Sequence, residues 1–141
     1  IYDTMWNSTR RMAEAIAEGI KSVNKDINVK IFNSGKSDKN DIMTEVFKSK
    51  VILVGSSTIN NGILSSTAAI LEMMRGLKFK DKKAAAFGSY GWGGESVKMI
   101  TEELKKDGFE ILNDGIKEKW IPDEEGLKRC REYGKNIASK I

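Results

Sequence analysis

The stretch Tyr2-Asp-Thr-Met-Trp-Asn-Ser-Thr9 runs from a short apolar start into a polar loop and then into a helix. From Ser8 onward, apolar residues recur at spacings of three and four, which predicts an amphipathic helix that Ser8 or Thr9 caps. Only Ile1 and Tyr2 precede the loop, although a strand usually has about five residues. We therefore expect that the chain starts inside its first strand and is part of a longer protein.

Segments typical of strands and of helices alternate along the rest of the chain. The apolar run Val51-Ile-Leu-Val54 is typical of a strand that is covered on both faces. The expected strands are residues 1–2, 28–32, 51–54, 83–88 and 109–120, the last with a possible turn at residues 113–115, and the expected helices begin near residues 8, 41, 67, 97 and 122. This alternation predicts one α/β domain over residues 1–141, with a doubly wound, five-stranded parallel sheet and helices on both faces.

The residue inventory excludes several kinds of chemistry. The chain has 141 residues, no histidine and a single cysteine, Cys130. It therefore lacks a Ser-His-Asp or Cys-His nucleophile system, a histidine-containing metal site and the thiolate ligands of an iron–sulfur cluster. Any redox chemistry must come from a cofactor, and we expect neither a catalytic residue nor a metal ligand here.

The net charge of +4 makes nucleic acid the first partner to consider. The basic residues are scattered, however, and the densest run, Lys78-Phe-Lys-Asp-Lys-Lys83, includes an aspartate and is more typical of a solvated face. No apolar stretch approaches the ~20 residues of a membrane span, and no secretory signal is present. We expect no nucleic-acid or membrane partner, and a cytoplasmic location.

The first loop has the composition of an anion site. Thr4, Ser8 and Thr9 offer hydroxyls and Asn7 offers an amide, all directly before or at the start of a helix. Unpaired N–H groups and the positive end of the helix dipole favour an anion at this position, and hydroxyls add uncharged donors. Ordinary capping would need only one of these side chains, so the cluster predicts a phosphate site.

Three other phosphate-binding folds lack their motifs in this sequence. There is no Gly-x-x-x-x-Gly-Lys-Ser/Thr segment, which excludes a P-loop NTPase, and the first turn has no Gly-x-Gly-x-x-Gly segment. A response-regulator receiver needs a carboxylate at the end of its third strand, but here that strand ends in Val54-Gly-Ser-Ser57.

Two further loops, after the strands 51–54 and 83–88, have the composition of a clamp for a flat ring. Asn60, Asn61 and Gly62 offer amide groups and a backbone that can adopt positive φ. Tyr90 and Trp92 stand among glycines on the other loop, and Trp6 can contribute from the first loop. For any one of these aromatic residues alone, packing in the core or at a rim is the simpler explanation. Taken together with a phosphate site, they indicate a phosphorylated ring compound such as FMN.

These loops resemble those of a known family. Residues 2–9 match the phosphate loop of flavodoxin-like domains, and the Met-Trp-x-Ser-Thr form is similar to that of flavodiiron proteins (A-type flavoproteins). Gly55-Ser-Ser-Thr-Ile-Asn-Asn-Gly62 resembles that family's second flavin loop, in which a proline is common where Ser57 stands, so we expect a looser loop here. Ser89-Tyr-Gly-Trp-Gly-Gly-Glu95 is similar to its third loop.

The resemblance implies the strand order 2-1-3-4-5 and FMN as the cofactor. It implies that the first loop binds the phosphate and that the other two line opposite sides of the isoalloxazine ring. The implied cofactor-binding residues are Thr4, Met5, Trp6, Asn7, Ser8, Thr9, Ser57, Thr58, Ile59, Asn60, Asn61, Gly62, Ser89, Tyr90, Gly91, Trp92 and Gly93. Trp120, at another strand end, is expected to be a packing residue away from these loops.

The resemblance also implies partners. In the family this domain follows a metallo-β-lactamase-like domain whose di-iron centre reduces oxygen or nitric oxide, and the flavin of one subunit serves the iron of the other in a head-to-tail homodimer. The expected electron donor is rubredoxin or an NAD(P)H-linked reductase. Two alternatives stay open, namely a stand-alone flavodoxin electron carrier and a flavodoxin-like partner-binding module without flavin, and whether the chain is an enzyme in its own right is undecided.

Overall fold

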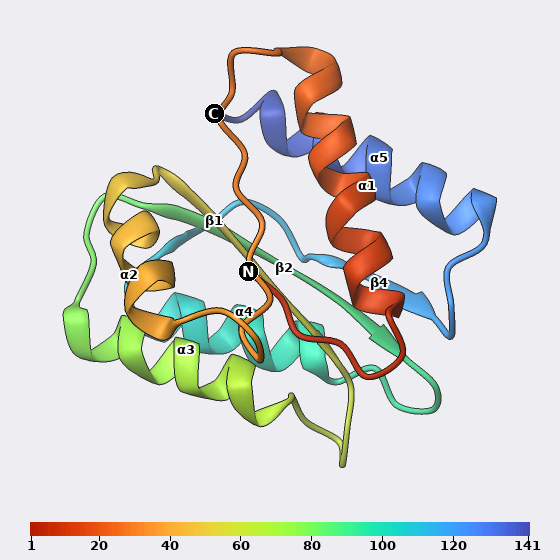
Figure 1. Ribbon diagram of the computed structural model, residues 1–141, viewed down its shortest axis with the longest axis horizontal. Helices are drawn as coiled ribbons and strands as arrows, with labels where there is room; N and C mark the ends of the chain where they lie inside the picture. Colours follow the sequence, from red (N-terminus) through yellow and green to blue (C-terminus); the bar gives the residue numbers. More distant parts are fainter.

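A parallel sheet lies between two layers of helices in the computed structural model, which describes all of residues 1–141 (Figure 1). Its strands are β1 (Val51–Ser57), β2 (Lys83–Tyr90), β3 (Glu110–Ile111) and β4 (Ile116–Lys119). Helices α1 (Ser8–Val23) and α5 (Glu124–Ala138) pack on one face, and α2 (Lys39–Lys48), α3 (Ser65–Leu77) and α4 (Ser96–Lys106) pack on the other. None of the helices combines the length and apolar composition that crossing a membrane requires.

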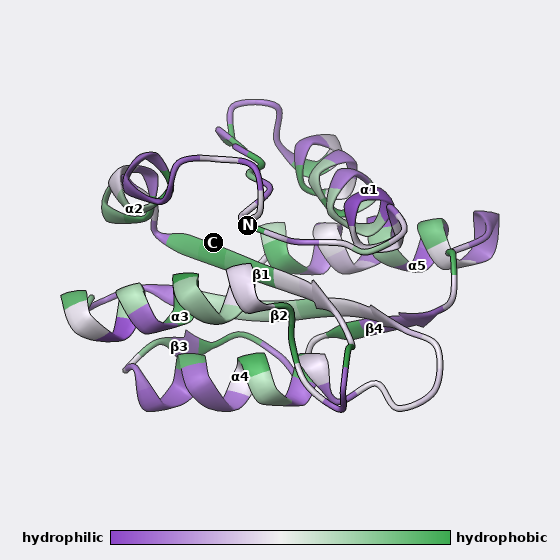
Figure 2. Cartoon of the chain, turned by 60° about the horizontal axis from the view of Figure 1, so that its bottom comes forward, coloured by the Kyte–Doolittle hydropathy of each residue, from purple (hydrophilic) through white to green (hydrophobic).

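Successive side chains of β1 and β2 point to opposite faces of the sheet, and this divides the apolar core into two clusters. Ile52 and Val54 of β1 pack with α2, α3 and α4, whereas Ala85 and Phe87 of β2 pack with α1 and α5. Figure 2 shows the start of β1 as hydrophobic and much of the helical surface as hydrophilic. Because successive side chains of a strand point to opposite faces, a continuous apolar run supplies both clusters at once.

One row of residues across the sheet confirms the expected order of the strand segments. Tyr2 forms parallel bridges with Asn33 on one side and Gly55 on the other. Gly55 pairs with Phe87 of β2, which in turn pairs with Ile116 of β4. The chain segments therefore lie side by side in the order 2-1-3-4-5 that the resemblance implies.

Two expected strands differ from the structure. Residues 28–32 are extended but are not part of a strand, and the next residue, Asn33, forms a single bridge with Tyr2. The expected strand 109–120 is split into β3 and β4, both of which pair with β2. The split falls at the predicted turn, where the backbone N–H of Gly115 donates to Oδ1 of Asn113 at 2.9 Å.

The helix ends show where side chains cap the backbone. Asp38 caps α2 two residues earlier than expected, since its carboxylate accepts from the backbone N–H groups of Asn40 and Asp41. The predicted cap of α1 by Ser8 or Thr9 is wrong, because both residues lie inside the helix and the N-cap position, Asn7, makes no side-chain capping bond. The first turn of α1 is therefore left without the capping bond that most helices have.

Helices α1 and α5 approach so closely that two glycines have no room for a side chain. A Cβ atom at Gly19 would lie 2.0 Å from the backbone oxygen of Arg131, and one at Gly134 would lie 2.1 Å from the backbone oxygen of Ile16. Since the obstacle is backbone in both cases, a side chain can be accommodated only if the helices move apart.

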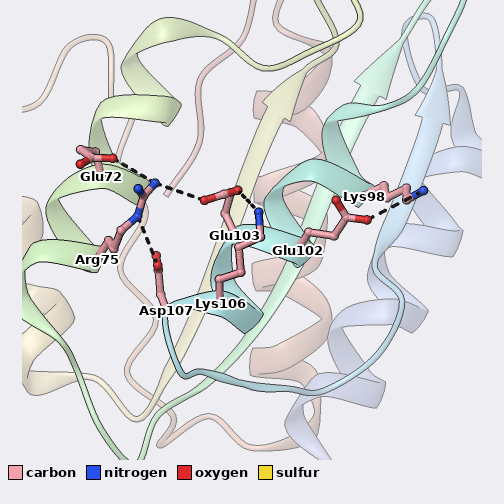
Figure 3. A network of polar contacts seen from close by, with 7 residues as sticks. All are labelled: Glu72, Arg75, Lys98, Glu102, Glu103, Lys106 and Asp107. Carbon is pink, nitrogen blue, oxygen red and sulfur yellow. Dashed lines mark hydrogen bonds and ion pairs between the residues drawn. The ribbon is translucent and has the colours of Figure 1, made fainter.

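A cluster of charged side chains links α3 to α4 (Figure 3). Arg75 of α3 contacts Glu72 of its own helix at 3.0 Å, Glu103 of α4 at 3.2 Å, and Oδ1 of Asp107 at 3.6 Å. The carboxylate of Asp107 is buried and neither of its oxygens accepts a hydrogen bond. Burial raises the pKa of Asp107, and Arg75 only partly opposes that shift.

We predict that Gly134→Ala lowers the free energy of unfolding by about 2 kcal/mol or more, as overpacking a tight contact does. The matched control is Gly76→Ala in α3, where a Cβ would meet nothing within 4 Å. That change should raise the free energy of unfolding by about 1 kcal/mol, because alanine favours a helix over glycine. Urea denaturation of both variants measures the difference, and equal stability of the two would contradict the packing argument.

We predict that Asp107→Asn raises the melting temperature at pH 7 by a few degrees. A pKa that is raised in the folded state means that the charged carboxylate, present at pH 7, opposes folding, and this cost disappears below the pKa of the unfolded chain. The gain should therefore vanish near pH 3. Calorimetry at both pH values tests this, with the exposed Glu102→Gln as control, and a lower melting temperature at pH 7 would show that the ion pair with Arg75 outweighs the burial.

Candidate functional site

Three loops meet at the carboxyl edge of the sheet, near the arrowheads of β2 and β4 in Figure 1. The first loop precedes α1, the second follows β1 and the third follows β2. Because β1 and β2 run parallel and pair in register from Val51 to Ser57, both strands end at the same level. The predicted binding residues of all three loops are therefore brought to one edge, which is where doubly wound sheets bind ligands.

Buried hydroxyls join the three loops. Oγ1 of Thr9 lies 3.0 Å from Oγ of Ser57 and 2.8 Å from Oγ of Ser89, and the two serine oxygens are 3.2 Å apart. The backbone N–H of Met5 also donates to Ser57 at 3.3 Å. The serine that stands at the usual proline position thus ties the second loop to the other two, where the sequence predicts a looser loop.

The start of α1 presents unpaired donors. The backbone N–H groups of Ser8, Thr9 and Arg10 have no acceptor in the structure. Oγ1 of Thr4, in the same loop, is buried and also lacks a partner. Arg10 pairs with Glu14 at 2.9 Å on the exposed side of the helix. Free N–H groups at the positive end of a helix, next to a buried hydroxyl without a partner, have the chemistry of an anion site.

The second loop is a tight hairpin. Ile59 and Gly62 exchange backbone hydrogen bonds of 3.2 and 2.7 Å, and the two residues between them, Asn60 and Asn61, have φ values of 49° and 57°. Positive φ at both central positions is the geometry of a type I′ turn, which asparagine tolerates. The expected positive φ in this loop is confirmed at the two asparagines, whereas Gly62 is not among the residues with positive φ.

The loops also carry exposed aromatic rings. Trp6 is 78% exposed and Trp92 is 88% exposed, although tryptophan is normally largely buried. Tyr90 is half-buried at the end of β2, and Nζ of Lys117 lies 5.7 Å from the centre of its ring. Aromatic rings that extend from these loops and are exposed to solvent are suited to contact a flat ligand.

Trp120 belongs to this group, and the expectation that it lies away from the loops is wrong. Its ring is 5.0 Å from that of Trp92, edge to face, and its backbone N–H donates to the oxygen of Tyr90 at 2.7 Å. The ring also lies close to Gly91, because a Cβ atom added to that glycine would be 3.0 Å from it. The signal that was missed is the position of Trp120 directly after β4, which pairs parallel to β2 and ends at the same edge.

The three loops offer hydrogen-bond donors and aromatic surface but little else. Thr58 anchors the second loop through a bond of 2.9 Å from its hydroxyl to Ser96 of α4. No group of three or more His, Cys, Asp or Glu residues lies close enough to hold a metal ion. Cys130 is buried in the core, as predicted, and burial raises the pKa of its thiol to about 12. The arrangement is suited to bind a phosphorylated aromatic compound.

Comparison with known proteins agrees with this description. A sequence model of the family described as flavodoxin matches residues 1–134. The chain is 50% identical over 137 residues to the anaerobic nitric oxide reductase flavorubredoxin of Escherichia coli strain K12, and the match covers 97% of this chain but only 28% of that protein.

Solved structures give the same result. The rubredoxin oxygen:oxidoreductase of Desulfovibrio gigas superposes with a TM-score of 0.92 at 34% identity, covering 99% of this chain and 34% of that one. An archaeal flavodoxin superposes with a TM-score of 0.84 at 27% identity, and 98% of its length is covered. The expected fold and the resemblance to flavodoxin-like domains of flavodiiron proteins are confirmed.

We predict that Thr9→Val lowers the free energy of unfolding by about 1 to 3 kcal/mol, since it leaves two buried serine hydroxyls short of a partner. The variant Thr9→Ser keeps the hydroxyl and should retain most of the stability. Chemical denaturation of both variants measures the contribution of the hydroxyl cluster. If valine and serine gave the same loss, the hydrogen bonds would not be what holds the loops together.

Proposed function

Because this chain belongs to the flavodoxin family and is an FMN-binding domain, we propose that it carries electrons between two redox partners. The observation that supports this most directly is the set of unpaired N–H groups at Ser8, Thr9 and Arg10 beside the exposed rings of Trp6 and Trp92. A phosphate and a flat ring are the two ends of FMN, and these groups lie on the same edge of the sheet.

The first loop fits the phosphate. The N–H groups at the start of α1 and the hydroxyl of Thr4 are donors without acceptors, and a bound phosphate would satisfy them. We assign the backbone of Ser8 and Thr9 and the hydroxyl of Thr4 to this role, with Met5, Trp6 and Asn7 completing the loop. The side-chain hydroxyl of Thr9 is already engaged with Ser57 and Ser89, so its part is to hold the loop in place.

The second and third loops fit the ring. We assign residues 57–62 to one side of the isoalloxazine and residues 89–93 to the other, with the rings of Tyr90 and Trp92 supplying stacking surface. When bound, FMN supplies the redox chemistry by accepting and donating one or two electrons, while the protein sets its orientation and surroundings. The rings of Trp92 and Trp120 would shield a bound flavin from water, and the hydrogen bond from the N–H of Trp120 to the oxygen of Tyr90 links β4 to the start of the loop that carries Trp92.

The partners are proposed from the relatives. The chain spans 28% of the flavorubredoxin it matches and 34% of the rubredoxin oxygen:oxidoreductase, so those proteins contain further domains. We propose that rubredoxin or an NAD(P)H-linked reductase donates electrons to this domain. We further propose that it passes them to a di-iron centre in a metallo-β-lactamase-like domain, upstream in the same protein or in the partner subunit of a head-to-tail homodimer, for reduction of oxygen or nitric oxide.

A stand-alone electron carrier is the second candidate function. The archaeal flavodoxin supports it, because this chain covers nearly the whole of that protein. Both functions use the same cofactor site and differ only in what surrounds the domain. We propose a cytoplasmic location for either one, since the single cysteine is buried as a free thiol, as is common under reducing conditions.

We predict that Thr4→Val weakens FMN binding about tenfold or more, because a lost hydrogen bond to a charged group costs ~1.5–3 kcal/mol. Riboflavin lacks the phosphate, so its affinity should not change in the variant. Thr44→Val on α2, whose hydroxyl bonds only to the backbone of its own helix, is the matched control. Titration of flavin fluorescence with the apoprotein of the unmodified chain and of each variant measures the affinities for FMN and riboflavin.

Two results of this titration would overturn the assignment. If Thr4→Val weakened the binding of FMN and of riboflavin equally, Thr4 would not be a contact of the phosphate. A colourless protein that fails to bind added FMN would leave the partner-binding module without flavin as the remaining explanation.

We predict that electron transfer from reduced rubredoxin slows about tenfold between low and high salt. This chain has a net charge of +4 and would attract an acidic electron donor, and salt screens that attraction. Arg11→Gln and Lys119→Gln, which remove exposed charges at the edge that carries the loops, should each slow the reaction at low salt. Lys25→Gln beyond the far end of α1 should not. Stopped-flow absorbance measures the rates, and identical rates for all three variants would contradict docking at this edge.

A further inference from the structure

Trp120 contacts three successive residues of the third loop. Its backbone N–H donates to the oxygen of Tyr90 at 2.7 Å, and a Cβ atom added to Gly91 would lie 3.0 Å from its ring. The centre of its ring is 5.0 Å from that of Trp92, with an angle of 74° between the two ring planes. One residue that follows β4 therefore braces the loop that follows β2, and these two strands end at the same edge of the sheet (Figure 1).

The backbone of this loop has little else to hold it. Residues 91–94 make no backbone hydrogen bond. Trp92 is 88% exposed, and the one aromatic ring in contact with it is that of Trp120. An exposed side chain exchanges freely between its rotamers when nothing lies against it. The contact with Trp120 therefore restricts the orientations that the ring of Trp92 can adopt.

The backbone of Trp120 is strained. Its φ is 57°, in the left-handed region that is unfavourable for a bulky side chain. Apart from Lys78, which caps α3, every other residue with positive φ in this chain is a glycine, an asparagine or an aspartate. Those residues tolerate the left-handed conformation. Glycine at position 120 would make the same turn without the strain, so the tryptophan ring needs another explanation.

Packing in the core does not explain this ring. Trp120 is 53% exposed and belongs to neither of the two apolar clusters that hold the helices on the sheet. Strained residues persist where the surrounding structure imposes them, and they are concentrated at functional sites. The contacts of the Trp120 ring are with Gly91 and Trp92, so the strained backbone serves the third loop.

We propose that Trp120 is a positioning residue of the flavin site, which fixes the ring of Trp92 before the ligand binds. This role rests on the proposed function, in which Trp92 supplies stacking surface for the isoalloxazine ring. The edge-to-face contact between the two indole rings stabilises one orientation of Trp92 in the free protein. A ligand that stacks on a ring already in place binds more tightly, because less conformational freedom is lost on binding.

The experiment measures the affinities of FMN and riboflavin for the unmodified chain, for Trp120→Gly, for Trp92→Ala and for the double variant. Glycine suits the left-handed backbone and keeps the N–H that bonds to Tyr90, so Trp120→Gly removes only the ring. Trp120→Phe keeps an aromatic ring, and Ile121→Ala changes the neighbouring exposed side chain as the matched control. Fluorescence titration gives the affinities, and far-ultraviolet circular dichroism of each apoprotein reports the coupling between the two indole rings.

We expect Trp120→Gly to weaken the binding of FMN and of riboflavin alike, by about threefold or more, because the ring is affected and the phosphate is not. Trp120→Phe should retain most of the affinity, and Ile121→Ala should retain all of it. In the Trp92→Ala background the loss of the Trp120 ring should change the affinity less than about twofold, because Trp120 acts through Trp92. The paired indole band of the unmodified apoprotein should disappear in Trp120→Gly, while the melting temperature stays the same or rises.

Unchanged flavin affinity in Trp120→Gly would overturn the proposal, and so would an equal loss of affinity with and without the Trp92 ring, because Trp120 would then act independently of Trp92. A large fall in the melting temperature of Trp120→Gly would also overturn it, by assigning the ring to the stability of the fold. An unmodified chain that binds neither flavin would refute the proposed function instead. The dichroism of the apoprotein would then decide the positioning role by itself, and the absence of the paired band would overturn that role.

Discussion

The register between β1 and β2 is the constraint on which the rest of the structure depends. Gly55 of β1 lies opposite Phe87 of β2, and a Cβ at Gly55 would be only 2.3 Å from the phenyl ring. A larger residue at this position would displace the ring of Phe87, which is buried in the core. Because parallel strands that pair in register end at the same level, the pairing from Val51 to Ser57 places Ser57 opposite Ser89, and both then reach Thr9 at the start of α1.

The site inverts the usual distribution of polar and apolar groups. The hydroxyls of Thr9, Ser57 and Ser89 are buried and bond to one another, while Trp6 and Trp92 project into solvent. Buried hydroxyls are stable when each has a partner, and here the partners come from three different loops, so the cluster holds the edge together without any charge. Exposed rings are costly in water, and a flat ligand that covers them would remove that cost.

Much of the fold and of the site could be predicted from the sequence. The alternation of apolar runs and helical periodicity predicted the layers and the number of strand segments, and the composition of three loops predicted the edge at which they meet. Trp120 was placed wrongly, because its position directly after a strand locates it only once that strand is known to pair beside β2. Positive φ at Asn60 and Asn61 depends on the bridge between Ile59 and Gly62, which is a property of the folded hairpin.

The sequence by itself determined the kind of ligand, since hydroxyls before a helix, aromatic residues among glycines and the absence of histidine are properties of the composition of short segments. Only the tertiary structure decided which groups are free to bind it. Thr9 and Ser57 offer equivalent hydroxyls in the sequence, but packing commits them to each other and leaves the hydroxyl of Thr4 without a partner. The physical reason is that a hydrogen bond depends on distances between segments far apart in the chain, and no local pattern contains those distances.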